Sequence, residues 1–391
     1  MNTSSLGRRL VLGLIVLLVI GGAGWLAWGQ LNGGLAPART VGYAANSTAT
    51  SKLAPILRQP VDLVTPLGAG YLFLNQLTGG LNYADVTGAI DLSSRIRLTA
   101  SSDQAIEGAN GPINDALINI EPTQNGEAII TTTMGVFLAH NAHTIIELPS
   151  YTKGSLNFVS SSYDASNHSL FLLSAYDKGI YRYQIDQPTS RPTKLYSSPL
   201  EVNRIVAGGG HVAVYFDDVP TTDPAVLAEY GKTRQLDPLI IDAASGKLIK
   251  TLTGFQPVTY LSISASGHYV ALKRKFELAM TVLDLATNRR ATLPSYDTSG
   301  ATWLGDILQI ARDHAIWSYD ATSSTAELVK LADVAEPVAS LARAGSTLLA
   351  TTTDSVTALL VPSGQTAMPA LLGQAPAPAA HPYQYFGPAA H

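Results

Sequence analysis

Short runs of alternating apolar and polar residues cover most of the chain, which is the pattern of β-strands with one buried face. The segments YVALKR (269–274) and IYRYQI (180–185) show it clearly, with Gly, Asn or Asp turn residues near their ends. Long runs with helical spacing are scarce. The pattern therefore predicts an all-β chain rather than a doubly wound α/β fold.

One unit is repeated along the chain. It consists of a short apolar strand, a Gly or Asn turn, a second apolar strand, an apolar-Asp strand with a polar turn, and a closing strand. Four copies are clear, and they cover residues 156–195, 204–252, 260–293 and 301–331. Three weaker copies begin near Val61, Ala116 and Val338. The first-hairpin turn residues Gly126, Asn167, Gly210 and Gly267 lie 41, 43 and 57 residues apart.

A period of about 40 to 50 residues made of four short strands is typical of a β-propeller. A four-stranded sheet cannot bury both of its faces alone, so each blade packs on its neighbours around a ring. The repeats predict a propeller over residues 61–372, with seven blades of about 45 residues each. Six or eight blades are also compatible with the spacing.

The repeats resemble those of WD40-like and YVTN-type propellers in exported bacterial proteins. The segment SASGHYVAL followed by VLDLATN carries their Ser-x-x-Gly, apolar strand and apolar-Asp turn pattern. The strict WD40 ending is absent, and the nearest approach to it is IWSYD at residues 316–320. The resemblance covers about 300 residues and implies a fold but no partner.

The amino-terminal region contains an uncharged apolar stretch of nineteen residues that begins at Leu10 and ends at Trp28. As a helix it would be about 28 Å long, close to the hydrocarbon thickness of a bilayer. Arg8 and Arg9 precede it, so the positive-inside rule places residues 1–9 in the cytoplasm and the rest of the chain outside. We expect a single-pass signal anchor in the cell membrane. The alternative is a signal peptide cleaved after Ala38.

The segments on either side of the repeats have a biased composition. Residues 29–60 are rich in small and polar residues, which predicts a flexible tether. Residues 373–391 alternate Ala and Pro, which predicts a disordered tail. A short aromatic docking motif at Tyr383, Tyr385 and Phe386 is the alternative for the tail.

Composition excludes several classes of function. The 391 residues carry a net charge of −4 and only 14% charged residues, with no basic footprint for nucleic acid. The chain has no cysteine, which excludes disulfides, thiolate catalysis and Cys-containing zinc sites. Motifs of serine hydrolases, zinc proteases, P-loop proteins and dinucleotide-binding proteins are absent from the sequence. We predict no catalytic, metal or cofactor residue.

For several polar residues, a structural role in a turn or hairpin is a better interpretation than metal binding or catalysis. Asp242 and Asp284 are each expected to cap the polar turn after an apolar strand, rather than to bind calcium. The segment YDASNHS at residues 163–169 is interpreted as a hairpin in the same way. The Ser-x-x-Lys match at residues 150–153 lies between Pro149 and Gly154, which does not suit the helix that this motif needs.

Three further polar groups have two interpretations each. His140 and His143 are interpreted as exposed turn residues rather than as metal ligands. The pair Asp217 and Asp218 is interpreted as the entry to a loop, although two buried carboxyls could do acid–base work. The charges of KRKFE (273–277) are expected on an edge strand, where they oppose edge-to-edge pairing.

The largest interruption of the repeat spans residues 219–238 and predicts a short helix. Asp223 and Pro224 suit its cap and first position, and Gly231 suits its end. Insertions in repeat proteins gather on one rim, where binding residues concentrate. The candidate partner-binding residues of this insertion are Leu227, Tyr230, Lys232 and Arg234. In the alternative, the helix only shields a blade edge, with Leu227 and Tyr230 turned inwards.

These observations predict a membrane-anchored extracytoplasmic propeller that acts as a binding or scaffold module for an envelope protein or a glycan. The first alternative is an extracytoplasmic enzyme, such as a glycan- or peptide-modifying hydrolase or lyase, with its site on the propeller loops. The second alternative is an envelope-assembly factor.

Overall fold

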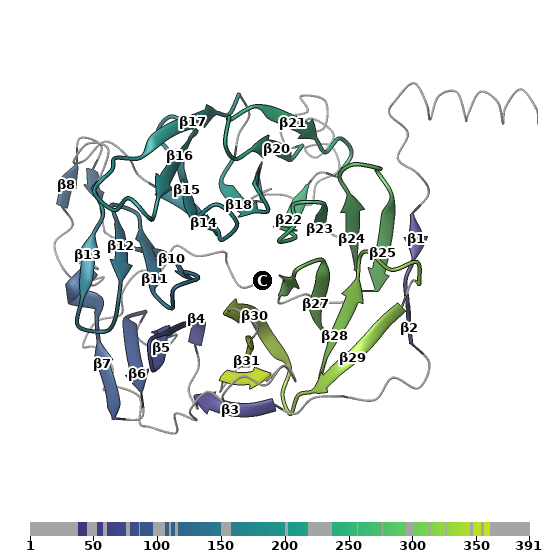
Figure 1. Ribbon diagram of the computed structural model, residues 1–391, viewed down its shortest axis with the longest axis horizontal. Coiled ribbons are helices and arrows are strands. Elements are labelled where there is room, and N and C mark those ends of the chain that lie inside the picture. Colours follow the sequence, from purple (N-terminus) through teal and green to yellow (C-terminus); the bar gives the residue numbers. More distant parts are fainter. Residues whose placement is uncertain are drawn as a thin grey trace, which may run out of the picture.

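The computed structural model describes the chain over residues 38–44, 53–57, 61–75, 79–85, 87–96, 106–108, 111–113, 116–149, 158–199, 202–217, 237–255, 257–275, 277–294, 300–312, 314–325, 327–344, 347–352 and 356–359. These residues form β-strands, turns and one 3-10 turn, η1 (Ser93–Ile96). Figure 1 shows the strands gathered into sheets that stand side by side around a ring.

The described strands form seven sheets of four or five strands, in which strands consecutive in the chain lie next to each other. The first sheet contains β4 (Val61–Leu67), β5 (Gly70–Asn75), β6 (Leu81–Asp85) and β7 (Gly88–Asp91). The second contains β10 (Leu117–Pro122), β11 (Ala128–Thr132), β12 (Val136–Ala139) and β13 (Ile145–Glu147). The third contains β14 (Phe158–Asp164), β15 (Ser169–Ser174), β16 (Gly179–Gln184) and β17 (Thr193–Ser197). The fourth contains β18 (Arg204–Gly208), β19 (His211–Tyr215), β20 (Leu239–Asp242) and β21 (Leu248–Thr251).

The remaining three sheets each take one strand from the amino-terminal region. The fifth contains β22 (Val258–Ile263), β23 (Tyr269–Arg274), β24 (Ala279–Asp284), β25 (Arg290–Pro294) and β1 (Arg39–Thr40). The sixth contains β26 (Ala301–Leu304), β27 (Ile307–Arg312), β28 (Ala315–Asp320), β29 (Glu327–Asp333) and β2 (Gly42–Tyr43). The seventh contains β30 (Val338–Ala344), β31 (Thr347–Thr352), β32 (Val356–Leu359) and β3 (Leu53–Leu57). A separate hairpin is formed by β8 (Ile106–Gly108) and β9 (Gly111–Ile113).

The first strand of each sheet is its innermost strand, and it contacts the first strands of the two neighbouring sheets. The contacts run from β4 through β10, β14, β18, β22, β26 and β30, and β30 returns to β4. The prediction of an all-β propeller is therefore confirmed. The predicted hairpin turns at Gly126, Asn167, Gly210 and Gly267 each join the first and second strands of a sheet.

The hydrophobic core is divided among the interfaces between neighbouring sheets. Leu74 and Ile130, for example, belong to one cluster between the first and second sheets. Phe73 and Leu349 belong to another, which joins the seventh sheet to the first. Second strands such as β15 are buried along their whole length because another sheet covers each face. Burial on both faces explains why these strands are nearly continuous apolar runs.

Within residues 29–60, which were predicted to be a flexible tether, residues 39–40, 42–43 and 53–57 instead form strands that pair with the propeller sheets. β1 pairs in parallel with β25, and β2 pairs in parallel with β29 on the next sheet. Val41 lies between them, 1% exposed, and packs in the core between the two sheets. β3 pairs with β32 and gives the last sheet its outermost strand, so both ends of the propeller sequence contribute to that sheet. Outer strands have an unpaired edge, which accepts a short extended segment through backbone hydrogen bonds alone.

One further prediction is wrong, and three others concern residues that the structure does not describe. The edge-strand interpretation of KRKFE is wrong, because β23 lies between β22 and β24 and the charges are at its end and in the next turn. Residues 219–236 of the insertion, the stretch from Leu10 to Trp28, and the tail at 373–391 lie outside the described residues. In the part of the chain that the structure describes, no helix is long and apolar enough to cross a membrane.

Candidate functional site

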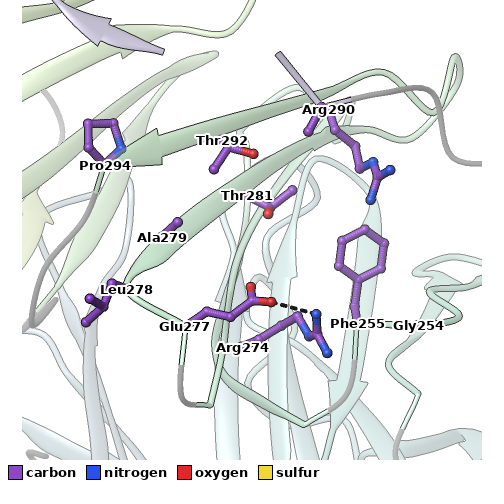
Figure 2. Close-up of a pocket in the computed structure, with 11 residues that line it drawn as sticks. Gly254, Phe255, Arg274, Glu277, Leu278, Ala279, Thr281, Arg290, Thr292 and Pro294 are labelled. Atoms are coloured by element: carbon purple, nitrogen blue, oxygen red, sulfur yellow. Dashed lines mark hydrogen bonds and ion pairs between the residues drawn. The ribbon is translucent and has the colours of Figure 1, made fainter. Parts of the chain in front are cut away.

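A cavity of about 550 Å³ lies at the outer part of the fifth sheet, on the side that faces the fourth sheet. Its volume is within the range of about 300–1,000 Å³ that is common for ligand pockets. Figure 2 shows the side chains around it. The residues that line it are Ala38, Gly254, Phe255, Arg274, Glu277, Leu278, Ala279, Thr281, Arg290, Thr292 and Pro294.

The floor of the pocket is built by the alternation of side chains along two paired strands. Thr281 of β24 is the direct partner of Thr292 of β25, and Ala279 is the partner of Pro294. Their sequence neighbours Met280 and Leu293 point to the other face, into the core shared with the sixth sheet. The period of two in a strand therefore gives this floor small and hydroxyl-bearing side chains, and leaves room above it.

Charged side chains lie at the sides of the pocket. Arg274 at the end of β23 donates to Glu277 at 2.6 Å, and both groups are partly exposed. The guanidinium of Arg290 lies 5.8 Å from the centre of the Phe255 ring, a cation–π arrangement. In the view of Figure 2 the guanidinium groups of Arg274 and Arg290 lie on opposite sides of that ring. Partial burial lowers the pKa of Arg290, but an arginine still remains charged at neutral pH.

One end of the pocket, at Ala279 and Pro294, lies at the face of the ring where the second strand of each sheet ends and the third begins, which we call the connection face. The other end, at Arg290, lies where β25 begins. Arg274 ends β23, and Ala279 begins β24. Gly254 and Phe255 follow the end of β21, which reaches the same face because the strands are antiparallel. The opposite face carries the hairpin turns of the repeats, and we call it the turn face.

The insertion predicted to carry the partner site also leaves from the connection face. Its described end is Asp237, which is 3% exposed and accepts a hydrogen bond from the backbone nitrogen of Gly254 at 3.3 Å. At its other end Asp217 forms an ion pair with Arg204 at 2.5 Å and accepts a hydrogen bond from the side chain of Asn203 at 2.7 Å. The predicted contact residues Leu227, Tyr230, Lys232 and Arg234 lie outside the described residues. Asp237 therefore connects this insertion to a residue that lines the pocket.

The predicted turn-capping carboxylates are confirmed on the turn face. Asp242 accepts hydrogen bonds from the backbone and the hydroxyl of Ser245 at 2.7 and 2.6 Å. Asp284 accepts hydrogen bonds from Ala286 and Thr287 in the same way. At Asp242 these bonds lower the pKa, against a smaller opposing effect of burial. At Asp284 burial is the largest single effect and raises the pKa, but the hydrogen bonds together outweigh it and leave the pKa below its usual value. Each aspartate is thus used within its own turn.

The other candidate groups, as far as the structure describes them, do not assemble into a site. His140 and His143 lie in the turn between β12 and β13, as predicted, and His140 contacts Glu127. Asp217 lies at the entry to the insertion loop, as interpreted, whereas Asp218 and residues 150–153 lie outside the described residues. Among the residues that the structure describes, no three His, Asp or Glu side chains are grouped to hold a metal ion.

A second polar region lies along the innermost strands, where side chains link one sheet to the next. Ser160 and Ser162 of β14 accept hydrogen bonds from the backbone nitrogens of Ile205 and Ala207 on β18, at 3.2 and 3.0 Å. Glu121 of β10 accepts a hydrogen bond from the nitrogen of Tyr163 at 2.8 Å, while its Oε2 atom is buried. Burial raises the pKa of Glu121 to about 7, although the hydrogen bonds act in the opposite direction. These groups hold the ring together and are too dispersed to form a pocket.

The comparisons with known proteins identify the fold. No protein-family profile and no curated protein sequence matches the chain. A chain in the crystal structure of a mitotic checkpoint complex superimposes with a TM-score of 0.54 and 13% sequence identity, over 81% of this chain and 94% of that one. This chain is a β-propeller. The extracellular domain of the putative one component system BT4673 from B. thetaiotaomicron gives a TM-score of 0.50 and 12% identity, over 80% of this chain and 43% of that one. At these identities the likeness shows the fold alone.

Sequence reasoning missed the pocket. Its residues come from four separate places in the chain. The charged KRKFE segment was the only local sequence feature that pointed towards it. The two arginines are sixteen positions apart in sequence, and Phe255 precedes both of them in the loop from the fourth sheet. No period or motif connects these positions, because the packing of the fifth sheet against the fourth sheet creates the cavity.

Proposed function

We propose that this chain is a binding and scaffold module, held outside the cell membrane by residues 10–28, that presents its connection face to a protein partner. The hydrogen bond from Gly254 to Asp237 carries the proposal, because it joins the end of the inserted segment to the rim of the pocket. Propellers are generally binding or scaffold modules, and loops that depart from a repeat scaffold are common places for binding residues.

The pocket chemistry favours binding over hydrolysis. Hydrolysis by acid and base requires two groups that exchange protons, such as a pair of carboxyls. Glu277 is the one carboxylate among the described residues that line the pocket, and it is paired with Arg274. The other polar lining groups are guanidinium and threonine hydroxyl groups, which suit recognition of an anionic or hydrogen-bonding surface.

The membrane anchor would hold the outer edge of the fifth sheet, where β1 pairs, near the bilayer. Ten residues separate Trp28 from Arg39, where the first described strand begins, and an extended chain of that length spans at most about 36 Å. The positive charges Arg8 and Arg9 before the stretch support a cytoplasmic amino terminus. We expect the full chain to stay in membranes during a carbonate wash, with its bulk open to protease from outside. A soluble form that starts near Arg39 would contradict the anchor.

The partner proposal is tested by crosslinking in native membranes and identification of the captured proteins. In one variant, residues 221–236 are replaced by a short Gly-Ser turn. In the control, residues 322–325 of the turn between β28 and β29, on the turn face, are replaced by Gly-Ser of equal length. We expect the first variant to lose the partner at an unchanged melting temperature, and the control to keep it. Retention of the partner by the first variant, or a loss that follows unfolding, would contradict the proposal.

A further inference from the structure

We propose that the outer edge of the fourth sheet, strand β21, binds residues 29–37 of the same chain, so that the amino-terminal segment meets the propeller one sheet earlier than β1. These nine residues lie outside the described residues and directly precede Ala38. The inference goes beyond the proposed function, because it concerns how the propeller is held and not which partner it meets.

The described amino-terminal strands show how this propeller binds an extended segment. β1 runs parallel to β25, and β2 runs parallel to β29 on the next sheet. The residue after each strand donates a backbone hydrogen bond to that sheet, Val41 to Thr292 at 2.8 Å and Ala44 to Leu328 at 2.9 Å. β21 is the outer strand of an antiparallel four-stranded unit, as β25 is, and runs in the same direction. It therefore presents the same kind of edge.

The edge of β21 carries exposed apolar side chains. Leu248 and Ile249 are 49% and 48% exposed, and β20 is the one neighbour of β21 among the described strands. By contrast, Ala291 and Leu328, which pair with β1 and β2, are 7% and 0% exposed. In β7, β13 and β17 the one exposed large hydrophobic residue that the structure describes is Ile90. β21 thus gains the most free energy from a covering strand.

The start of the described chain lies next to this edge. Ala38 lines the pocket together with Gly254 and Phe255, which follow the end of β21. Val41 has the corresponding position one sheet further on, in the core between the fifth and sixth sheets. β2 begins three residues after β1. The same spacing, continued backwards, places a two-residue strand at residues 36–37 on the fourth sheet.

The local sequence suits that position. Neighbouring amides along a strand point to opposite sides. Since the residue after each amino-terminal strand donates to the sheet, the second residue of the strand directs its amide away from it. Pro37 has no amide hydrogen and would occupy such a second position, where no bond is lost. Leu35 precedes this strand in an uncharged segment, and its side chain can cover Leu248 or Ile249.

Docking of this segment shortens the connection to the membrane. With the proposed anchor at residues 10–28, seven residues separate Trp28 from the docked strand, and they span at most about 25 Å when extended. The fourth sheet, from which the insertion at residues 219–238 leaves, would then be held within that distance of the bilayer.

The test uses disulfide formation in the purified full chain in detergent. The chain has no cysteine, so an engineered pair reports only on its own two positions. Thr40→Cys with Thr292→Cys is the positive control, because these residues are Cα partners in β1 and β25. Neighbouring strands are close enough for a disulfide, whereas Cα atoms more than about 7 Å apart are not bridged. Mild oxidation and mass spectrometry of an unreduced digest measure the yield.

The test pairs combine Ala36→Cys with Ile249→Cys or with Thr251→Cys, both exposed on β21. The negative control combines it with Thr193→Cys, an exposed position on β17 of the third sheet. We expect one of the β21 pairs to close within the chain about tenfold more than the β17 pair. Equal yields in the three pairs would overturn the proposal. Disulfide-linked dimers at low protein concentration would also overturn it, because the edge would then hold a second copy.

Hydrogen exchange gives a second measurement that needs no cysteine. Leu35→Asp should speed exchange of the peptide that covers residues 247–252 about threefold or more, because the docked strand loses its apolar contact. Asn32→Asp adds the same charge at a polar position and should leave this exchange unchanged. Unchanged exchange in Leu35→Asp would contradict the docking, and this result decides the question if the cysteine variants unfold. Partner capture is measured separately, so the proposed function can fail while the docking stands.

Discussion

Asp164 at the end of β14 accepts a hydrogen bond at 2.9 Å from the backbone nitrogen of Gly210, which lies in the hairpin turn of the next sheet. Its other oxygen accepts hydrogen bonds from the backbone and the hydroxyl of Ser166 in its own turn. One carboxylate, 1% exposed, therefore joins two neighbouring sheets on the turn face. Asp242 closes only its own turn, although it also belongs to the repeat.

The first prediction concerns this link between sheets. We expect Asp164→Ala to lower the free energy of unfolding by about 2–4 kcal/mol, because it removes charged hydrogen bonds and leaves the nitrogen of Gly210 without its acceptor. Asp242→Ala is the matched control and should cost less, since its turn is exposed to water. Urea denaturation of both variants gives the comparison. Equal losses of unfolding free energy in the two variants would show that the contact between the sheets adds nothing to stability.

The second prediction concerns two adjacent glycines in the turn between β18 and β19. Both have positive φ values, 57° at Gly209 and 79° at Gly210. A Cβ atom on Gly209 would lie 2.0 Å from the nitrogen of Gly267 in the next sheet, whereas one on Gly210 would meet nothing within 4 Å. We expect Gly210→Ala to cost about 1–2 kcal/mol of stability through backbone strain. Gly209→Ala should cost about 1–3 kcal/mol of stability in addition, because its Cβ atom would also overpack against the next sheet.

Thermal and urea unfolding of the two glycine variants measure this difference. The same residue type is introduced at neighbouring positions, so the difference isolates the close approach of the two hairpin turns. A Gly209→Ala variant as stable as Gly210→Ala would mean that the sheets separate without cost at this point.

The third prediction concerns the docking of the amino-terminal strands. Val41 is buried between the outer strands of the fifth and sixth sheets, and the backbone nitrogen of Ala44 donates to Leu328 at 2.9 Å. We expect Val41→Asp to speed hydrogen exchange of the Ala44 amide about tenfold or more, because about 1.5–3 kcal/mol of side-chain burial is lost. Thr40→Asp places the same charge at an exposed neighbour and should leave the exchange unchanged. Mass-spectrometric exchange measures both variants.

The fourth prediction concerns the dependence of stability on pH through Glu121. Burial raises its pKa from 4.5 to about 7 in the folded chain, so the folded state keeps a proton that the unfolded chain releases. Stability from this group is complete below pH 4.5 and falls as the pH rises towards about 7. The slope is at most about 1.4 kcal/mol per pH unit.

Urea unfolding of Glu121→Gln between pH 4.5 and 8 tests this effect. We expect the variant to lose the part of the pH dependence that the carboxyl group provides and to be more stable than the parent protein at pH 8. Glu327→Gln, at an exposed position of β29, is the control and should keep the pH profile of the parent. Identical profiles for the parent and Glu121→Gln would contradict a raised pKa.

The sequence by itself determined the repeated unit, the all-β class and the polar turns. Alternation of side chains, the glycine of the first hairpin and the aspartate after the third strand act within a few residues of one another, so the local order of residues is sufficient. Asp242 and Asp284 accept their predicted hydrogen bonds from residues two or three positions away. Such short-range effects are visible in any window of the chain.

Only the tertiary structure decided which segments, distant in the sequence, pair with each other in the ring. Residues 38–44 carry little apolar periodicity, yet they pair with β25 and β29, which lie about 250 and 285 positions later. Pairing at a sheet edge uses the backbone, which is the same in every residue, so the side-chain pattern does not reveal it. The pocket and the raised pKa of Glu121 have the same origin, since both depend on how far neighbouring sheets exclude water from groups that are distant in sequence.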